Sequence, residues 1–365
     1  MKKIVFFTGS QALSGGTERA CANVANLLIS YGFETTILSQ YEGQRSAHEV
    51  DPNVELHELN VKRKKGIRGY LGTISKLLCY VRKHRPDIVI AVESLSFLYF
   101  LPLLMFPKRP VLINWEHFNA RVSLGKRSRG WSRKLAVFLA DHIVVLSDAD
   151  KAIWIRELKC SQSKITRIYN VNPLEAARRP FYSSAEKSNP SAIAVGRLTY
   201  QKGFDLLIHS WSMIPETVRD GWRLNIYGEG PDRDFLQRKI ISLNLDHQIS
   251  LSGQTADILA EYTKSDFFIL SSRFEGFGLV LLEALSCGLP VISFDCFAGP
   301  SEIISEGNNG ILVPPSDIVL LSRAISGLMQ NDAMRAKMAR IDKNTLDRFS
   351  SGVIGLEWLS LIGRY

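Results

Sequence analysis

The chain has 365 residues, of which 45% are hydrophobic and 22% charged, and a formal net charge of +9. The length predicts two domains of ordinary size, and the composition excludes a disordered chain and a disulfide scaffold. Five cysteines without C-x-x-C spacing favour a reduced, cytosolic setting without structural zinc.

The chain begins with a short apolar run that a polar loop cuts off before a signal-peptide core could form, so we expect Lys3–Phe7 to be the first buried strand. The most apolar stretch, Phe97–Phe106, contains Pro102 and falls short of the roughly 20 residues needed to cross a bilayer. We expect a core helix there, with shallow membrane insertion as the alternative.

Apolar runs bounded by turn residues alternate with helix-period stretches such as Glu18–Tyr31, which is typical of parallel sheets built from βαβ units. The strands expected in the first half are Ile4–Thr8, Glu34–Ser39, Ile88–Val92, Val111–Trp115, His142–Leu146 and Ile165–Ile168. Those expected in the second half are Ser191–Val195, Arg223–Tyr227, Ile249–Ser252, Phe267–Leu270, Val291–Phe294 and Gly310–Val313. The pattern predicts an α/β protein with two Rossmann-like domains.

The domain boundary is expected in Leu174–Pro190, which is polar and lacks periodicity. This placement gives an N-terminal domain over residues 1–175 and a C-terminal domain over residues 190–345. Residues 346–365 contain a last helical stretch, near Asp347–Ile362, that we expect to pack back toward the N-terminal domain. A ligand touching both domains is expected in the cleft between them, outside the carboxyl ends of the strands.

Basic residues gather in two windows of the first half that contain no acid, and these windows hold fifteen of the 45 basic residues. The first window holds Lys62, Arg63, Lys64, Lys65, Arg68, Lys76, Arg82, Lys83 and Arg85, and the second holds Arg121, Lys126, Arg127, Arg129, Arg133 and Lys134. The windows predict an anionic surface, a lipid headgroup or a nucleic acid as partner. Within the first window, Gly66–Lys83 has the spacing of an amphipathic helix, which fits either an anionic membrane or packing on the sheet with a solvated basic edge.

Four glycine-bearing loops follow predicted strands. Gly15 and Gly16 precede the first helix, whose N–H groups can face a phosphate. Arg197 and Lys202 stand five positions apart around a turn, where fixed cations can neutralise a departing diphosphate. The other two loops are GEGP, with Gly228 and Gly230, and EGFGLVLLE, with one carboxylate at each end, Glu275 and Glu283.

The order of these loops resembles that of the retaining GT-B glycosyltransferases of family 4, across nearly the whole chain. The matching segments are GGTER, NWEHFN, GRLTYQKG, YGEGPDR, LSGQT, SSRFEGFGLVLLEALSCGLPVISFD, GPSEII and NGILV. The resemblance implies two Rossmann-like domains with parallel sheets facing across a cleft, the first for the acceptor and the second for the donor. The segment DCFAGPSEII also resembles enzymes of that family that build bacterial lipopolysaccharide, capsule and lipid-linked glycans.

Site roles follow from the resemblance by position. It implies that Arg197 and Lys202 bind the donor diphosphate, that Glu275 contacts the donor hexose, and that Glu283 binds the ribose hydroxyls. The remaining donor-binding positions are Gly15, Gly16, Gly228, Gly230, Gly253, Phe277, Gly278 and Leu279. His117, within NWEHFN, falls where many members place a histidine near the donor sugar, with a purely structural histidine as the alternative. His117, Arg197, Lys202 and Glu275 are thus the expected catalytic residues.

The implied reaction is a retaining, metal-independent transfer of a hexose or N-acetylhexosamine from a UDP-sugar, with no cofactor. The expected acceptor is a saccharide linked to a polyprenyl diphosphate or to lipid A, with its phosphates held by the basic residues of the first window. We therefore expect a cytoplasmic protein at the inner face of the plasma membrane, and the oligomeric state stays open. The alternatives are a GT-B nucleotide-sugar epimerase and a basic nucleic-acid-binding protein; a dinucleotide oxidoreductase is disfavoured because no G-x-G-x-x-G follows a strand.

Overall fold

The computed structural model describes residues 1–13, 15–41, 46–61, 67–175, 190–340 and 343–365. The chain divides into two compact units. The first comprises Met1–Val171 with Phe349–Tyr365, and the second comprises Asn172–Arg348. Most of the expected linker, and with it Lys62, Arg63, Lys64 and Lys65 of the first basic window, lies outside the described residues.

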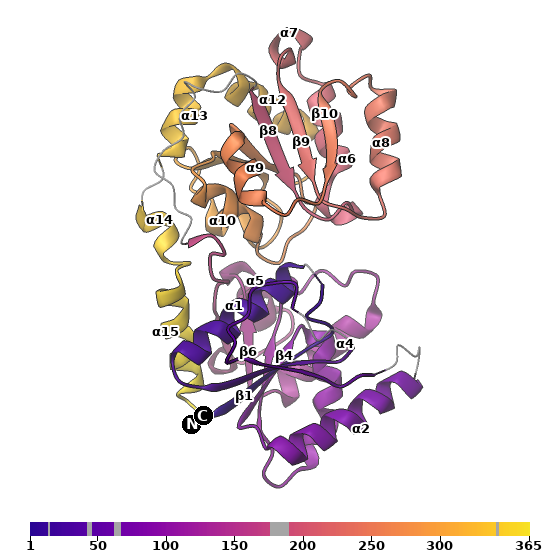
Figure 1. The fold of residues 1–365 in the computed structure, drawn as a ribbon, viewed down its shortest axis with the longest axis vertical. Coiled ribbons are helices and arrows are strands. Elements are labelled where there is room, and N and C mark those ends of the chain that lie inside the picture. The colour runs from indigo at the N-terminus through magenta and orange to yellow at the C-terminus, as the bar shows by residue number, and fades with distance from the viewer. Residues whose placement is uncertain (14, 42–45, 62–66, 176–189, 341–342) are drawn as a thin grey trace. The chain divides into compact units, whose positions relative to one another are not determined.

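The first unit is built on a parallel sheet of seven strands in the order β3-β2-β1-β4-β5-β6-β7 (Figure 1). Its strands are β1 (Lys3–Thr8), β2 (Glu34–Ser39), β3 (Glu55–Glu58), β4 (Ile88–Val92), β5 (Val111–Trp115), β6 (His142–Val145) and β7 (Ile165–Arg167). Its helices are α1 (Gly16–Ser30), α2 (Ile67–His84), α3 (Ser94–Phe97), η1 (Leu98–Met105), α4 (Arg127–Leu139), α5 (Asp148–Arg156), η2 (Gln162–Lys164) and α15 (Ser351–Ile362). Strands such as β4 are buried along their whole length, which explains their continuous apolar runs.

Helices cover both faces of this sheet. Helix α15, from the end of the chain, packs against α1, while η1 packs against both α2 and α4. The chain moves from β1 to β2 in one direction along the sheet, and from β4 through β5 to β6 in the other. Because crossovers between parallel strands are right-handed, α1 and α4 lie on opposite faces of the sheet. In α15, Trp358 is fully buried, and its ring centroid lies 5.1 Å from that of Trp115.

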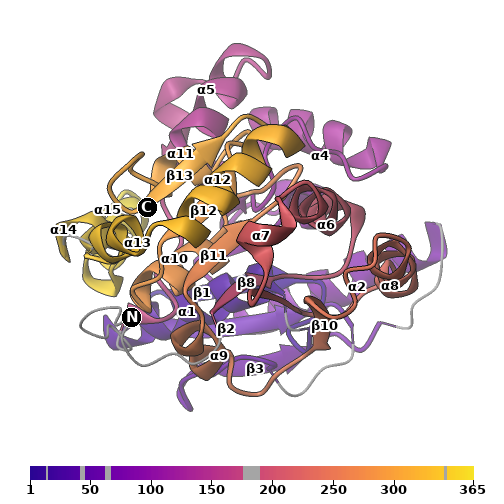
Figure 2. The same ribbon diagram turned by 90° about the horizontal axis from the view of Figure 1, so that it is seen from above.

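The second unit has a parallel sheet of six strands in the order β10-β9-β8-β11-β12-β13. Its strands are β8 (Ser191–Val195), β9 (Arg223–Tyr227), β10 (Ile249–Gly253), β11 (Phe267–Leu270), β12 (Val291–Phe294) and β13 (Gly310–Val313). Its helices are η4 (Tyr200–Lys202), α6 (Phe204–Ser212), α7 (Glu216–Arg219), α8 (Arg233–Ser242), α9 (Ile258–Lys264), α10 (Leu279–Ser286), α11 (Pro300–Ile303), α12 (Ile318–Gln330), α13 (Asp332–Ala339) and α14 (Lys343–Asp347). Helix α6 packs against both α8 and α12, and Figure 2 shows these three helices over one face of the sheet, with α9 and α10 over the other.

Every expected strand is present, so the prediction of two parallel Rossmann-like sheets is confirmed. Strand β3 was not expected, because its sequence ELHE has no apolar run; it lies at the sheet edge, where charged residues guard against pairing with other chains. The expected core helix at Phe97–Phe106 is instead mostly the 3₁₀ helix η1, with Pro102 inside it. Its buried side includes Phe100 and Leu103, but Met105 is 86% exposed.

Candidate functional site

The carboxyl ends of the second sheet carry most of the expected donor-binding residues. Strand β8 lies between β9 and β11, and the chain leaves it toward β9 and returns on its other side at β11. Such a reversal of strand order is where open α/β sheets bind ligands. The loop after β8 carries Arg197 and Lys202, and the loop after β11 carries Glu275.

Lys202 and Glu275 meet at this reversal point. The ammonium nitrogen of Lys202 lies 2.6 Å from Oε1 of Glu275, and Ser272 donates a hydrogen bond of 2.6 Å to the same oxygen. Both charged side chains are largely buried, with 16% of Lys202 and 7% of Glu275 exposed. A partly buried pair is screened less than a surface pair, so the site holds a fixed cation beside a carboxylate.

A second ion pair holds the turn that carries Lys202. The guanidinium of Arg273 binds both carboxylate oxygens of Asp205, at 2.8 and 2.7 Å. Ser271 donates a hydrogen bond to the carbonyl of Lys202, at 3.0 Å. Gly203 follows with φ +62°, and a Cβ there would lie 2.1 Å from the carbonyl oxygen of Ser271. The contact therefore requires glycine, and the backbone fixes the position of Lys202.

Arg197 is exposed, and within the described residues its guanidinium has no ion-pair partner. It lies in the same loop as Lys202, so the loop after β8 presents one cation that is held and one that is accessible.

The turn before α10 depends on close backbone contacts. Gly278 is the N-cap of α10 with φ +97°, a region that glycine adopts readily and other residues rarely do. From the next loop, Gly299 approaches Phe277 so closely that a Cβ would lie 2.1 Å from the Phe277 carbonyl oxygen. The helix therefore begins at Leu279 from a rigid turn, with its first N–H groups at an N-terminus that favours anions.

Glu283 lies one turn inside α10 and does not join Glu275. It is 4% exposed, and Tyr262 donates a hydrogen bond of 2.9 Å to its Oε2. The two carboxylates therefore have different neighbours, a lysine for Glu275 and a tyrosine for Glu283, and their expected hexose and ribose roles stay a prediction.

Gly228 and Gly230 have a packing reason for being glycine. A Cβ at Gly228 would lie 1.9 Å from the carbonyl oxygen of Gly196, and one at Gly230 would lie 2.3 Å from that of Leu198. The N–H of Gly228 also donates to the carbonyl of Gly253, at 2.7 Å. These contacts join the loops after β8 and β9 to each other and to the end of β10, and the expected contacts to the base stay a prediction.

In the first unit, the strand order reverses between β1 and β4. Gly15 is the N-cap of α1 and Gly16 is its first residue, so the helix begins two residues before the position we expected, and its contact with a phosphate stays a prediction. The Nε2 of His48 lies 3.1 Å from the carbonyl oxygen of Gly15.

His117 lies in the loop after β5 and is buried. Burial lowers the pKa of its imidazole to about 4, although Glu116 acts in the opposite direction. The ring is therefore neutral near pH 7, and its centroid lies 4.3 Å from that of Trp115. Its Nε2 is buried without a hydrogen-bond partner among the described residues.

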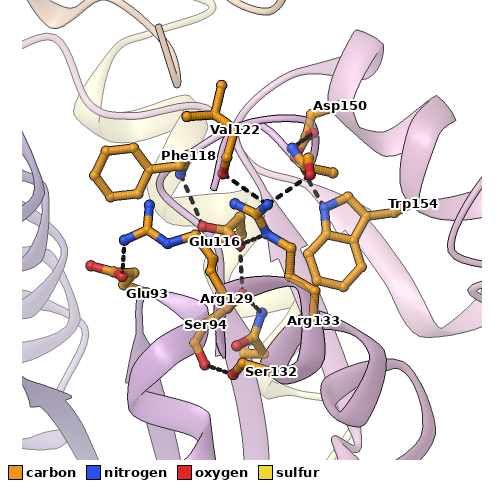
Figure 3. Close-up of polar contacts among 12 residues, drawn as sticks. Glu93, Ser94, Glu116, Phe118, Val122, Arg129, Ser132, Arg133, Asp150 and Trp154 are labelled. Carbon is orange, nitrogen blue, oxygen red and sulfur yellow. Dashed lines mark hydrogen bonds and ion pairs between the residues drawn. The ribbon is translucent and has the colours of Figure 1, made fainter. Parts of the chain in front are cut away.

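Figure 3 shows the buried polar network that shapes this loop. Arg133 donates to Glu116 at 2.7 Å and to the carbonyls of Ala120 and Val122 at 2.7 and 3.0 Å. Burial alone would raise the pKa of Glu116, but Arg133 and hydrogen bonds from Ser94 and Phe118 hold it below its usual value.

Asp150 supports the same loop from α5. Its Oδ1 accepts a hydrogen bond of 2.6 Å from the N–H of Ala120, and its Oδ2 accepts one of 3.1 Å from Trp154. Burial raises the pKa of Asp150 to about 7 despite these hydrogen bonds.

The network takes two of the six cations of the second basic window away from the anionic partner expected there, while Arg121, Lys126, Arg127 and Lys134 are exposed. Arg129 and Arg133 are each 2% exposed, and they pair with Glu93 and Glu116, at 2.5 and 2.7 Å. The cations of the first basic window also differ in their surroundings. Lys76 donates to the carbonyls of Leu59 and Asn60, at 2.6 and 2.7 Å, and so anchors α2 rather than facing a ligand.

The other described cations of that window, Arg68, Arg82, Lys83 and Arg85, are exposed. Arg68 and Arg82 are fourteen positions apart on α2, hence about 21 Å along the helix axis at 1.5 Å per residue. A single diphosphate cannot span that distance, so these two ends of α2 do not hold one acceptor diphosphate together.

No group of three histidine, cysteine, aspartate or glutamate side chains that could hold a metal occurs in the part of the chain that the structure describes. Among those same residues, no helix is both long and apolar enough to span a membrane.

Sequence reasoning missed several residues that contact the expected donor-binding residues or the turns that carry them. They are Ser272 beside Glu275, Tyr262 beside Glu283, the pair Asp205 and Arg273, and the glycines Gly203 and Gly299. Ser272 and Arg273 lie within the motif SSRFEGFG, three and two positions before Glu275, so their proximity in sequence was an available signal. Asp205 lies three positions after Lys202 and offered the same signal, whereas Tyr262 lies 21 positions before Glu283 and only the fold brings it there.

Comparison with known proteins agrees with this geometry. Residues 14–176 match the family model for Glycosyltransferase Family 4, and residues 179–345 match the model for Glycosyl transferases group 1. The lipopolysaccharide 1,6-galactosyltransferase of Escherichia coli K12 is 30% identical over 70% of this chain and 70% of its own.

Two further relatives match over nearly the whole length. The amylovoran biosynthesis glycosyltransferase AmsD of Erwinia amylovora is 29% identical over 93% of both chains. An α-1,4-N-acetyl-D-galactosaminyltransferase of Campylobacter jejuni, which by name acts on an undecaprenol-linked saccharide, is 24% identical over 99% of this chain and 98% of its own.

Solved structures support the fold. Anabaena Alr3699/HepE in complex with UDP superimposes with a TM-score of 0.80 over the full length of both chains, at 18% identity. The chain therefore belongs to the glycosyltransferases of family 4, with the GT-B fold. It is a glycosyltransferase, as the sequence resemblance predicted.

Proposed function

We propose that the protein is a retaining glycosyltransferase that moves a hexose or N-acetylhexosamine from a UDP-sugar to a lipid-linked saccharide in the synthesis of a bacterial surface polysaccharide. The observation that carries the proposal is the pairing of Lys202 with Glu275 where the strand order of the second sheet reverses. This is where an α/β sheet binds a nucleotide, and the pair offers a cation for phosphate next to an acceptor for sugar hydroxyls.

The donor diphosphate lies, in this proposal, between the loop after β8 and the N-terminus of α10. Arg197 and Lys202 supply positive charge as the diphosphate departs, and the N–H groups at Gly278 and Leu279 bind its oxygens. A rigid turn suits this task, because preorganised donors need no rearrangement when charge develops. These groups do the work that a divalent metal does in other glycosyltransferases.

The two carboxylates bind the two polyol ends of the donor. Glu275, with one oxygen held by Lys202 and Ser272, accepts hydrogen bonds from hexose hydroxyls. Glu283 accepts hydrogen bonds from the ribose hydroxyls, while Tyr262 orients its carboxylate. The β-phosphate of the donor helps to deprotonate the acceptor hydroxyl on the same face of the sugar, which retains the anomeric configuration.

The lipid-linked acceptor is supported by relatives. The Campylobacter jejuni relative is named for an undecaprenol-linked acceptor and the Escherichia coli relative for lipopolysaccharide. Solved structures of similar fold contain UDP or UDP-glucose. A protein that glycosylates such a lipid works at the inner face of the plasma membrane, where anionic headgroups meet the exposed cations of the first unit.

The test is a panel of nucleotide-sugars scored first by thermal shift, since a donor stabilises the folded protein according to its affinity. The donor that stabilises most is then radiolabelled and incubated with a bacterial membrane extract, with and without EDTA. We expect label in the lipid fraction, unchanged by EDTA, and a product with the anomeric configuration of the donor. Conversion of free UDP-sugar without transfer would instead identify an epimerase and contradict the proposal.

A further inference from the structure

The outer face of α4 exposes large apolar side chains beside cations. Arg127, Trp131, Lys134 and Phe138 follow at intervals of four, three and four residues, so they form one stripe along the helix. Trp131 is 69% exposed and Phe138 is 77% exposed. The ammonium of Lys134 lies 5.8 Å from the centroid of the Trp131 ring.

This exposure is unusual within the chain. The other five of the six tryptophans are at most 6% exposed. The opposite side of α4 is the one that packs against the first unit, and its buried residues include Ser132, Ala136 and Val137. The exposed aromatic residues are therefore not explained by packing within the first unit.

Neighbouring elements extend the stripe into a surface. Because η1 packs against both α2 and α4, the three helices lie on the same side of the first sheet (Figure 1). Met105 at the end of η1 is 86% exposed and Leu71 on α2 is 55% exposed. The guanidinium of Arg82 lies 5.0 Å from the centroid of the Phe106 ring. We define the α2–α4 surface by Leu71, Arg82, Met105, Trp131, Lys134 and Phe138.

The two charged side chains that define this surface, Arg82 and Lys134, are both cations. From Leu59 to Pro86 and from Ser94 to Ala140 the sequence contains a single acid, Glu116. That carboxylate is buried and paired with Arg133, so it does not offset the exposed cations. Aromatic rings beside lysine and arginine, without acids, complement the headgroup region of an anionic bilayer.

We propose that the α2–α4 surface docks the protein on an anionic lipid bilayer. Trp131 and Phe138 enter the headgroup region, and Arg82 and Lys134 contact lipid phosphates. This docking would bring the protein to the lipid-linked acceptor and therefore rests on the proposed function. The experiment that tests the docking needs neither donor nor acceptor. It assigns α4 the apolar contacts, whereas the sequence pointed only to α2.

The experiment uses the full chain with vesicles of phosphatidylcholine, with and without phosphatidylglycerol. We expect the protein to sediment with the phosphatidylglycerol vesicles at low salt and less at moderate salt. Trp131 is the exposed tryptophan, so vesicle binding should also remove most of the tryptophan emission that aqueous iodide can quench.

The W131A/F138A variant should bind these vesicles about tenfold more weakly or worse, because each aromatic side chain loses its apolar burial. The matched control is F235A, which removes a 50% exposed phenylalanine from α8 of the second unit and should bind as wild type does. All three side chains are exposed, so thermal unfolding should be unchanged; if the double variant is unstable, F138A alone serves.

Absence of sedimentation with phosphatidylglycerol vesicles at low salt would overturn the proposal. Equal binding by wild type and W131A/F138A would also overturn it, since the apolar contacts would then lie elsewhere. If vesicle binding fails while UDP still stabilises the protein, only the docking surface is wrong. If vesicles bind but no nucleotide-sugar does, the proposed function fails instead.

Discussion

Both units carry ionic groups at the carboxyl ends of their strands, but these groups differ in burial and in what they contact. In the second unit, Arg197 is exposed and the pair of Lys202 and Glu275 is partly accessible, so the charges are available to a ligand. In the first unit, the pair of Arg133 and Glu116 is 2% and 0% exposed and lies in the network of Figure 3, where Arg133 holds the backbone of the loop that contains His117. Topology fixes where a charge lies, and burial decides whether it binds a ligand or shapes a loop.

The largest expected effect comes from breaking the buried pair of the first unit. R133M leaves Glu116 buried without its cation, so we expect the free energy of unfolding to fall by roughly 3–5 kcal/mol in urea denaturation. The control is R121M, which removes an ion pair with Glu157 whose side chains are 57% and 50% exposed; its expected loss is below about 1 kcal/mol. Equal losses in the two variants would contradict a special role for burial.

Removing the two cations of the second unit should lower turnover. R197A, at an exposed side chain, should leave stability nearly unaffected, whereas K202A also leaves the 7% exposed Glu275 without its cation and should lower stability. If the proposed function holds, each of R197A and K202A should lower turnover at saturating donor by about a hundredfold or more, because a cation that stabilises the departing diphosphate is then lost. K337A, at an exposed lysine of α13, is the control and should keep wild-type turnover. Near wild-type turnover in either R197A or K202A would remove that residue from the site.

The pH dependence of stability sharpens the comparison further. The pKa of Asp150 is raised to about 7 in the folded protein from a usual value of 3.8, so the folded state binds more protons than the unfolded state between these values. This group's contribution to stability is therefore full below about pH 4 and is lost as the pH rises toward 7.

We expect D150N to gain stability relative to wild type as the pH rises from 5 to 8, measured by urea denaturation at each pH. His117 has a pKa of about 4 in the folded protein, so its pH dependence has the opposite sign. Its contribution to the free energy of unfolding is lost as the pH falls from about 6.5 toward 4. A difference between D150N and wild type that does not vary with pH would show that Asp150 does not titrate in this range.

The smallest effect is expected at Glu283. Y262F removes the hydroxyl that donates to this buried carboxylate, so UDP affinity should fall about fivefold, as expected for one hydrogen bond of about 1 kcal/mol. Turnover at saturating donor should stay near wild type, because the ribose lies away from the reacting bond. Calorimetry with UDP checks the affinity; if E283Q weakens UDP binding and Y262F does not, Tyr262 does not orient the carboxylate.

The sequence predicted the sheets well, because buried parallel strands are apolar along their whole length. It did not predict β3, whose residues are polar at an exposed edge. Only the family resemblance predicted that Lys202 and Glu275 share a site, because the two residues are 73 positions apart in the sequence.

The sequence did not predict which residues of the basic windows are buried. Counting cations did not reveal that Arg129 and Arg133 are buried, because their partners Glu93 and Glu116 lie 36 and 17 positions earlier and fall outside the window. Nor did the sequence mark Trp131 and Phe138 as exposed, since apolar residues in a predicted helix are ordinarily assigned to its buried face.

Helix α15 has a consequence for how the protein is made. The first unit is completed by residues that follow the entire second unit in the chain, among them Trp358, packed on Trp115, and Glu357, paired with Arg167 at 2.9 Å. On the ribosome, the first sheet therefore waits with one face only partly covered while the second unit is synthesised and folds. A chain cut short before Ser351 should be a chaperone client, even though both of its sheets are encoded in full.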